Sequence, residues 1–143
     1  MKMNKKILFV CIGNACRSIM AEAITRHYWK GRFEPASAGI HPLGRISEGT
    51  LQVLQEINVS ADNLRSKGIA ELDLSRFDRI INLSEYPLED FIPWRYRAKV
   101  IDWYVRDPYG QSLDAYRRTL DAIEWLVTEK VPEWLGNSDR NEA

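Results

Sequence analysis

The chain has 143 residues, which suits a compact globular domain with a buried core. Apolar residues make up 45% of it and charged residues 28%, ordinary proportions for a globular protein. Basic and acidic residues both number 20, and a formal net charge of zero disfavours general nucleic-acid binding. No apolar run approaches the length of a membrane span or a signal peptide, so we expect a cytoplasmic protein without a membrane partner.

Strands and helices are predicted to alternate along the first third of the chain. The apolar run at residues 7–10 predicts a strand that is buried on both faces. Residues 18–29 predict a helix, in which Glu22 and Arg26 have the spacing of a surface ion pair. A second strand is expected at residues 33–38, so the chain begins with a strand–helix–strand unit.

The same alternation continues to the end of the chain. Residues 47–57 predict a helix, and residues 77–83 and 98–103 predict two further strands. Ser112 is a good N-cap for a last helix, whose apolar residues recur at helical spacing at Leu113, Tyr116, Leu120, Ile123 and Val127. The polar tail after residue 136 is expected to fray. We therefore predict one α/β domain over residues 1–143, with a mostly parallel sheet between helices.

The octet CIGNACRS, residues 11–18, directly follows the first predicted strand and contains both cysteines. A loop with cysteine, five residues and then arginine can curl around a tetrahedral oxyanion, because its backbone N–H groups and the next helix N-terminus point inward. Arg17 supplies two parallel hydrogen bonds to the oxyanion. The same positive field stabilises Cys11 as a thiolate nucleophile, and Ser18 can donate a hydrogen bond to it.

Three interpretations of the octet stand beside one another: a phosphate-binding loop, a redox pair of cysteines, and the buried end of a strand. Gly13 permits backbone conformations that other residues avoid, and Asn14 tolerates left-handed geometry. These two residues favour the phosphate-binding loop. In parallel α/β sheets ligands bind beyond the carboxyl ends of the strands. Cys11 and Asp107 both follow predicted strands, so we expect the fold to bring them together.

The octet resembles the loop of the low-molecular-weight protein tyrosine phosphatases, which reads C-x-G-N-x-C-R-S. The turn formed by Asp107, Pro108 and Tyr109 resembles the second motif of that family, and a predicted helix follows it as in the family. The resemblance implies a flavodoxin-like three-layer sandwich, with a four-stranded parallel sheet and helices on both faces. It also implies hydrolysis of phosphotyrosine in proteins, or of small aryl phosphates, without a metal or another cofactor.

The resemblance assigns a role to each motif residue. Cys11 would attack phosphorus and form a phosphocysteine, while Arg17 stabilises the charge of the transition state. Asp107 would protonate the leaving phenolate and then activate the hydrolytic water. The phosphate would be bound by the remainder of the loop, namely Ile12, Gly13, Asn14, Ala15, Cys16 and Ser18.

Further residues take supporting roles by the same resemblance. Cys16 corresponds to a second loop cysteine that can form a reversible disulfide with the nucleophile. Ser37 corresponds to a serine that bonds the loop asparagine, here Asn14. Tyr109 is expected at the rim of the pocket, and His41 is a further candidate for that rim.

Parts of the sequence depart from the phosphatases. Residues 37–44, SAGIHPLG, resemble the arsenate reductases of the same superfamily more closely, yet no cysteine follows Cys16 to complete a three-cysteine relay. Many phosphatases also have a histidine where residues 64–67 here read Leu-Arg-Ser-Lys. Two alternatives to a phosphatase therefore remain: an arsenate reductase that uses an external small thiol, and a non-catalytic phosphate-binding module.

Overall fold

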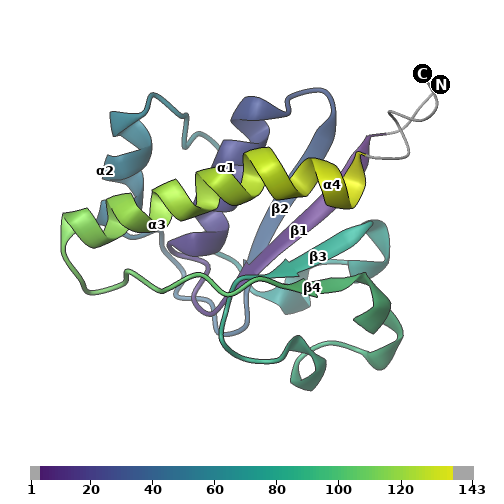
Figure 1. Cartoon of the computed structure of the whole chain (residues 1–143). Helices are drawn as coiled ribbons and strands as arrows, with labels where there is room; N and C mark the ends of the chain where they lie inside the picture. Colours follow the sequence, from purple (N-terminus) through teal and green to yellow (C-terminus); the bar gives the residue numbers. More distant parts are fainter. Residues whose placement is uncertain (1–3, 137–143) are drawn as a thin grey trace.

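The computed structural model describes residues 4–136, which contain one parallel four-stranded sheet (Figure 1). The strands lie in the order β2-β1-β3-β4 and comprise β1 (Lys5–Cys11), β2 (Phe33–Gly39), β3 (Arg79–Asn82) and β4 (Val100–Asp102). Residues 7–10 of β1 are fully buried, as the apolar run predicts for a central strand. β2 is an edge strand and therefore tolerates Pro35, which has no N–H to donate.

The α-helices cover one face of the sheet. They are α1 (Arg17–Tyr28), α2 (Glu48–Glu56), α3 (Leu113–Trp125) and α4 (Val131–Leu135), with a π-helical turn at Leu126–Lys130 between the last two. Their apolar side chains join Ile7 and Phe9 of β1 in one core cluster. The side chains of Ser47 and Ser112 cap α2 and α3, so both predicted helix starts are correct to within a residue.

The opposite face is covered by short 3₁₀-helices, which pack against Leu8 and Val10 of β1. These are η1 (Ile69–Glu71), η2 (Leu74–Arg76), η3 (Leu88–Asp90) and η4 (Trp94–Lys99). Pro87 and Pro93 each stand directly before one of these turns and interrupt any longer helix in that crossover. The predicted flavodoxin-like α/β sandwich is confirmed, with a second outer layer that is thinner than a layer of α-helices.

The strand order places the site. From β1 the chain moves first to β2 on one side and later to β3 on the other, so the carboxyl ends of β1 and β3 form the topological switch point. Cys11 is the last residue of β1, and Leu83 directly follows β3. The predicted frayed tail lies outside the described residues. Among residues 4–136, no helix is both long and apolar enough to cross a membrane.

Candidate active site

Residues 12–16 form a loop between β1 and α1, and their amides donate no backbone hydrogen bond to another part of residues 4–136. Asn14 adopts the left-handed region at φ 48°, as the sequence predicts. Cys16 occupies the N-cap position of α1 without a side-chain capping bond, and the first turn of α1 contains no acidic residue. The N–H groups at this helix start therefore lack the side-chain acceptor that Ser47 and Ser112 give to α2 and α3.

The glycine that the loop requires is Gly39, at the end of β2. A Cβ atom there would lie 2.6 Å from the Ile12 carbonyl oxygen and 2.9 Å from the Asn14 nitrogen. Gly13 does not use the conformational freedom that glycine permits: its φ is not positive, and a Cβ would make only ordinary contacts, the nearest 3.6 Å from Leu43 Cβ. Sequence reasoning missed Gly39 because its neighbour in space is far away in the chain.

A chain of hydrogen bonds leads to the sulfur of Cys11. The backbone N–H of Lys67 donates to Asn14 Oδ1 over 2.9 Å, and Asn14 Nδ2 donates to Ser18 Oγ over 2.7 Å. Ser18 Oγ lies 2.9 Å from Cys11 Sγ. A Cys11 thiolate has no proton to donate, so when the sulfur is ionised Ser18 is the donor of this bond and stabilises the charge.

The expected bond between Ser37 and Asn14 is absent, because both side chains have other partners. Ser37 Oγ donates to Glu22 Oε1 over 2.6 Å, while the two ends of the Asn14 amide are taken by Ser18 and Lys67. Glu22 is buried on α1, and its charge makes it a stronger acceptor than a neutral amide. The Glu22–Arg26 ion pair forms as predicted, but its carboxylate is in the interior and not on the surface.

Arg17 is 1% exposed and is anchored by carbonyls from two crossovers. Its Nη1 donates to Val105 O over 2.8 Å and to Leu83 O over 3.1 Å, and it also lies 3.7 Å from Glu85 Oε1. The buried Nε has no hydrogen-bond partner among the described residues. With Nη1 held in this way, the Nε–Nη2 edge is available for bidentate binding of an oxyanion.

Asp107 lies beside Arg17 on the wall of a cavity of about 190 Å³. Its Oδ2 lies 3.5 Å from Arg17 Nη2, and its Oδ1 accepts the N–H of Tyr109 over 3.0 Å, which orients a carboxylate that is 41% exposed. The two expected rim residues, Tyr109 and His41, also line this cavity. The complete lining is Cys11, Ile12, Gly13, Ala15, Cys16, Arg17, His41, Leu43, Asp107 and Tyr109.

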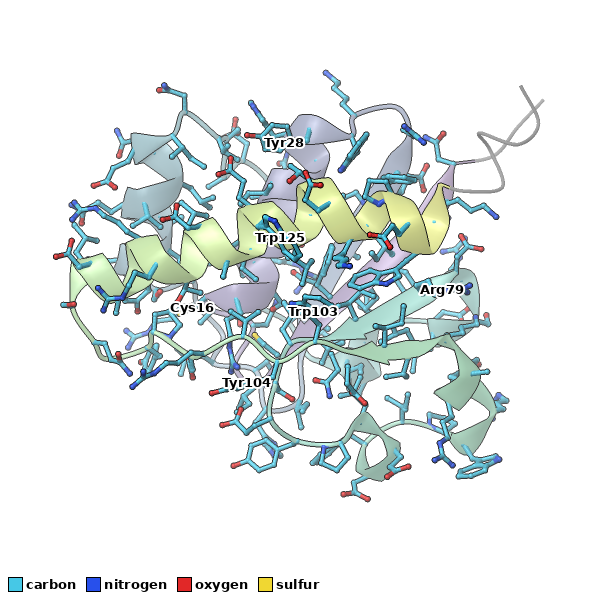
Figure 2. The ribbon with its side chains drawn as sticks, in the orientation of Figure 1. Cys16, Tyr28, Arg79, Trp103, Tyr104 and Trp125 are labelled. Atoms are coloured by element: carbon cyan, nitrogen blue, oxygen red, sulfur yellow. The ribbon has the colours of Figure 1, made fainter. Side chains whose placement is uncertain are left out.

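Cys16, the N-cap residue of α1, lies on the face of the sheet that α3 covers (Figure 2). Its sulfur lies 3.2 Å from Ser47 Oγ and 3.7 Å from the Tyr116 hydroxyl. Burial raises the pKa of this thiol above its ordinary value, although the surrounding hydroxyls oppose that shift. Both cysteines are free thiols in this structure. The disulfide with Cys11 stays a prediction.

Comparison with known proteins identifies the family. The family model for low molecular weight phosphotyrosine protein phosphatase matches residues 6–139. The chain belongs to this family. A curated relative, the glutaredoxin arsenate reductase of Synechocystis, is 28% identical over 127 residues, which cover 89% of this chain and 93% of the relative.

Two solved structures have the same fold. The Erwinia amylovora tyrosine phosphatase is 25% identical with a TM-score of 0.82, and the match covers 94% of this chain and 95% of that one. Vibrio vulnificus Wzb in complex with benzylphosphonate is 25% identical with a TM-score of 0.80, covering 92% and 99%. The protein is thus an enzyme of a superfamily whose members have a catalytic cysteine and whose names include both tyrosine phosphatases and arsenate reductases.

Metal ligands do not gather at this site. Within residues 4–136, no group of three or more histidine, cysteine, aspartate or glutamate side chains is placed to hold a metal ion. The charged groups that face the cavity are instead Arg17 and Asp107. An anion bound here would therefore meet a guanidinium, backbone amides and a carboxyl group.

Proposed function

We propose that this protein hydrolyses phosphotyrosine or other aryl phosphates through a phosphocysteine on Cys11. The observation that carries the proposal is the placement of Asp107, whose carboxylate lies 3.5 Å from Arg17 on the wall of the cavity that contains Cys11. A nucleophile, an oxyanion clamp and a proton donor thus share one cavity. A binding module would need only the clamp, so this arrangement favours an enzyme over the non-catalytic alternative.

In the first step the Cys11 thiolate attacks phosphorus in line with the ester oxygen. The S–P bond forms as the P–O bond to the leaving group breaks, and protonated Asp107 gives its proton to that oxygen. The Nε–Nη2 edge of Arg17 and the amides of residues 12–16 bind the equatorial oxygens. These donors are already in place, so little reorganisation is needed in the transition state.

In the second step a water molecule attacks the phosphocysteine. Asp107, now a carboxylate, takes a proton from this water as the new P–O bond forms. The S–P bond breaks, the electron pair returns to Cys11, and Ser18 stabilises the released thiolate through its hydrogen bond. Inorganic phosphate leaves and the enzyme returns to its starting state. No metal or other cofactor takes part.

The residues that line the cavity favour a substrate with an aromatic ring. Beyond the loop itself, the lining includes Leu43 and the rings of His41 and Tyr109. Tyr109 is 47% exposed, so about half of this residue is open to solvent. A phenyl ring carried by the phosphate can pack against these groups, whereas an inorganic oxyanion has no apolar part to bury there.

Arsenate reduction is the second candidate, favoured by the name of the Synechocystis relative. In that reaction the Cys11 thiolate binds arsenate with loss of water. An external thiol then attacks the Cys11 sulfur, arsenic(V) leaves as arsenite with the electron pair, and a second thiol frees Cys11 from the mixed disulfide. Because this route returns Cys11 to the thiol, both of the thiols that are oxidised in each turnover are external ones.

One set of assays tests this choice. The wild type and the variants Cys11→Ser, Asp107→Asn and Asp121→Asn are assayed with p-nitrophenyl phosphate, phenyl phosphate, and arsenate plus a small thiol. Asp121 is an exposed carboxylate on α3 and serves as the control. We expect Cys11→Ser to abolish hydrolysis but still bind phosphate in titration calorimetry, and Asp107→Asn to lower kcat about 10²- to 10⁴-fold.

The leaving group distinguishes acid catalysis from a positional effect. Phenyl phosphate has the poorer leaving group and depends more on protonation, so Asp107→Asn should impair its turnover more than that of p-nitrophenyl phosphate. Equal losses on both substrates would contradict the role of Asp107 as the acid. A wild-type enzyme that is inactive on both esters but reduces arsenate with thiols would replace the phosphatase by the reductase, and inactivity in every assay would favour the binding module.

A further inference from the structure

Residues 65–68, which we call the brace, lie against the phosphate-binding loop. Ser66 Oγ donates to the Gly13 carbonyl over 3.1 Å, and the Lys67 N–H donates to Asn14 Oδ1 over 2.9 Å. The brace is joined to β2 as well, because Gly39 donates its N–H to the Lys67 carbonyl over 2.9 Å. The main chain of Lys67 therefore connects the loop with the sheet edge.

The side chain of Lys67 anchors the brace to buried groups of the protein. It is 11% exposed, and its ammonium donates to the Arg65 carbonyl over 3.0 Å while lying 4.0 Å from Glu22 Oε1. Glu22 is 5% exposed and also binds Ser37 of β2 and Arg26 of α1. Burial lowers the pKa of Lys67, and the Glu22 carboxylate opposes that shift. The ammonium thus links the brace to α1 through a buried anion.

We infer that Lys67 is a positioning residue for the nucleophile. Its ammonium, held by Glu22, fixes the brace so that Asn14 orients Ser18 towards the sulfur of Cys11. This inference rests on the proposed role of Cys11 as nucleophile but not on the choice between phosphatase and reductase.

The conformation of Asn14 explains why the brace is needed. A non-glycine residue at φ 48° is held there by its surroundings, and here the Lys67 N–H supplies one of the two bonds to its side chain. With a neutral side chain at position 67, Glu22 would lose its ion pair with Lys67 and keep its interactions with Arg26 and Ser37. The brace would then lose its ionic link to α1, and Asn14 would lose a fixed donor. The Ser18 hydroxyl would spend less time directed at the Cys11 sulfur.

Alkylation of Cys11 measures this effect without any substrate. Each variant is made in a Cys16→Ala background, so that Cys11 is the sole thiol, and its rate of alkylation by iodoacetamide is recorded against pH. Lys67→Met should raise the pH of half-maximal rate by about half to one unit and slow alkylation at neutral pH about three- to tenfold. Lys67→Arg keeps the charge and should restore the profile. Arg65→Met is the control, since Arg65 belongs to the brace but its ion pair with Glu71 is exposed.

A Lys67→Met profile that coincides with that of the Arg65→Met control overturns the inference. So does an equal shift in Lys67→Arg, which would indicate a packing effect and not the charge. Should Lys67→Met fail to show a cooperative thermal transition, Glu22→Gln replaces it, with the same shift expected and an unchanged profile overturning the inference. Failure of the phosphatase proposal would instead appear as a lack of ester hydrolysis. The alkylation rates are measured without any ester, so the two failures are distinguishable.

Discussion

The functional side chains of the site are oriented by main-chain groups of other residues. Arg17 is anchored by the carbonyls of Leu83 and Val105, which follow β3 and β4. Asp107 is oriented by the N–H of Tyr109 two residues on. The main chain around the site therefore controls the geometry of these side chains, and substitutions that disturb it are the informative ones.

Gly39→Ala is the sharpest such substitution. Its added Cβ would lie 2.6 Å from the Ile12 carbonyl oxygen, which belongs to the backbone and cannot move aside easily. We expect the free energy of unfolding to fall by about 1–3 kcal/mol, as for other overpacked sites, together with a loss of aryl phosphate turnover. Urea unfolding and steady-state kinetics measure the two effects.

Gly13→Ala is the matched control for stability. Its nearest new contact would be an ordinary one of 3.6 Å with Leu43 Cβ, so its unfolding free energy should stay within about 1 kcal/mol of the wild type. If Gly39→Ala were as stable as Gly13→Ala, the close approach between β2 and the loop would be contradicted.

Among the elements, α1, α2 and α3 meet at Cys16. The ring of Tyr116 on α3 packs directly on Gly49 of α2, where a Cβ would lie 2.7 Å from the ring. Its hydroxyl and that of Ser47 both contact the Cys16 sulfur at the start of α1. This packing places a buried thiol and a phenol with raised pKa values at the junction of three helices.

These raised pKa values predict that stability falls at alkaline pH. Above the ordinary thiol pKa of 9.0 the unfolded chain loses a proton that the folded protein keeps at Cys16, so the free energy of unfolding decreases as pH rises. Burial of Tyr116 acts in the same direction from its ordinary pKa of 10.0. We expect Cys16→Ala and Tyr116→Phe each to reduce the difference between urea unfolding at about pH 7 and at about pH 10.

Tyr104→Phe serves as the control for the phenol, because Tyr104 is 57% exposed. It should leave the pH difference as in the wild type. A pH difference that is unchanged in Cys16→Ala would show that the thiol titrates alike in the folded and unfolded states, which contradicts the effect of its burial.

In the molecule as a whole, the site and the last helix lie at opposite ends of β1 (Figure 1). Val131 and Leu135 of α4 are buried in the core on the helix-covered face. A Cβ at Gly136, directly after α4, would lie 3.6 Å from the ring of Phe33, which pairs with Lys5 at the start of β1. Cys11 is at the other end of that strand.

This separation predicts that stability and activity respond independently. Leu135→Ala should lower the free energy of unfolding by about 2–5 kcal/mol, because it leaves a cavity at a side chain that is 5% exposed. kcat and KM of the folded fraction should stay within about twofold of the wild type. Leu51→Ala, at a position that is 41% exposed on α2, is the control and should cost much less stability. A change in kcat of the folded fraction well beyond about twofold would contradict the separation.

Local patterns in the sequence were sufficient to predict the strands, the main α-helices and the loop of the site. A continuous apolar run predicts the central strand, Ser47 and Ser112 mark two helix starts, and the octet at 11–18 indicates an oxyanion site. These features depend on residues within a few positions of one another, where periodicity and capping act. The 3₁₀-helices and the π-helical turn were not predicted, because such short elements carry no periodic pattern.

The partners of the site residues were decided by the tertiary structure alone. The sequence did not indicate that Ser37 would bind Glu22 and not Asn14, that the Glu22 carboxylate would be buried, or that Gly39 would lie against the loop. Lys67 likewise meets the loop from a crossover 53 residues further along the chain than Asn14. The sequence by itself determined what chemistry the octet can perform. The groups that position the octet are set by how distant segments of the chain pack against it beyond the sheet edge. Such contacts between distant segments leave no local pattern in the sequence.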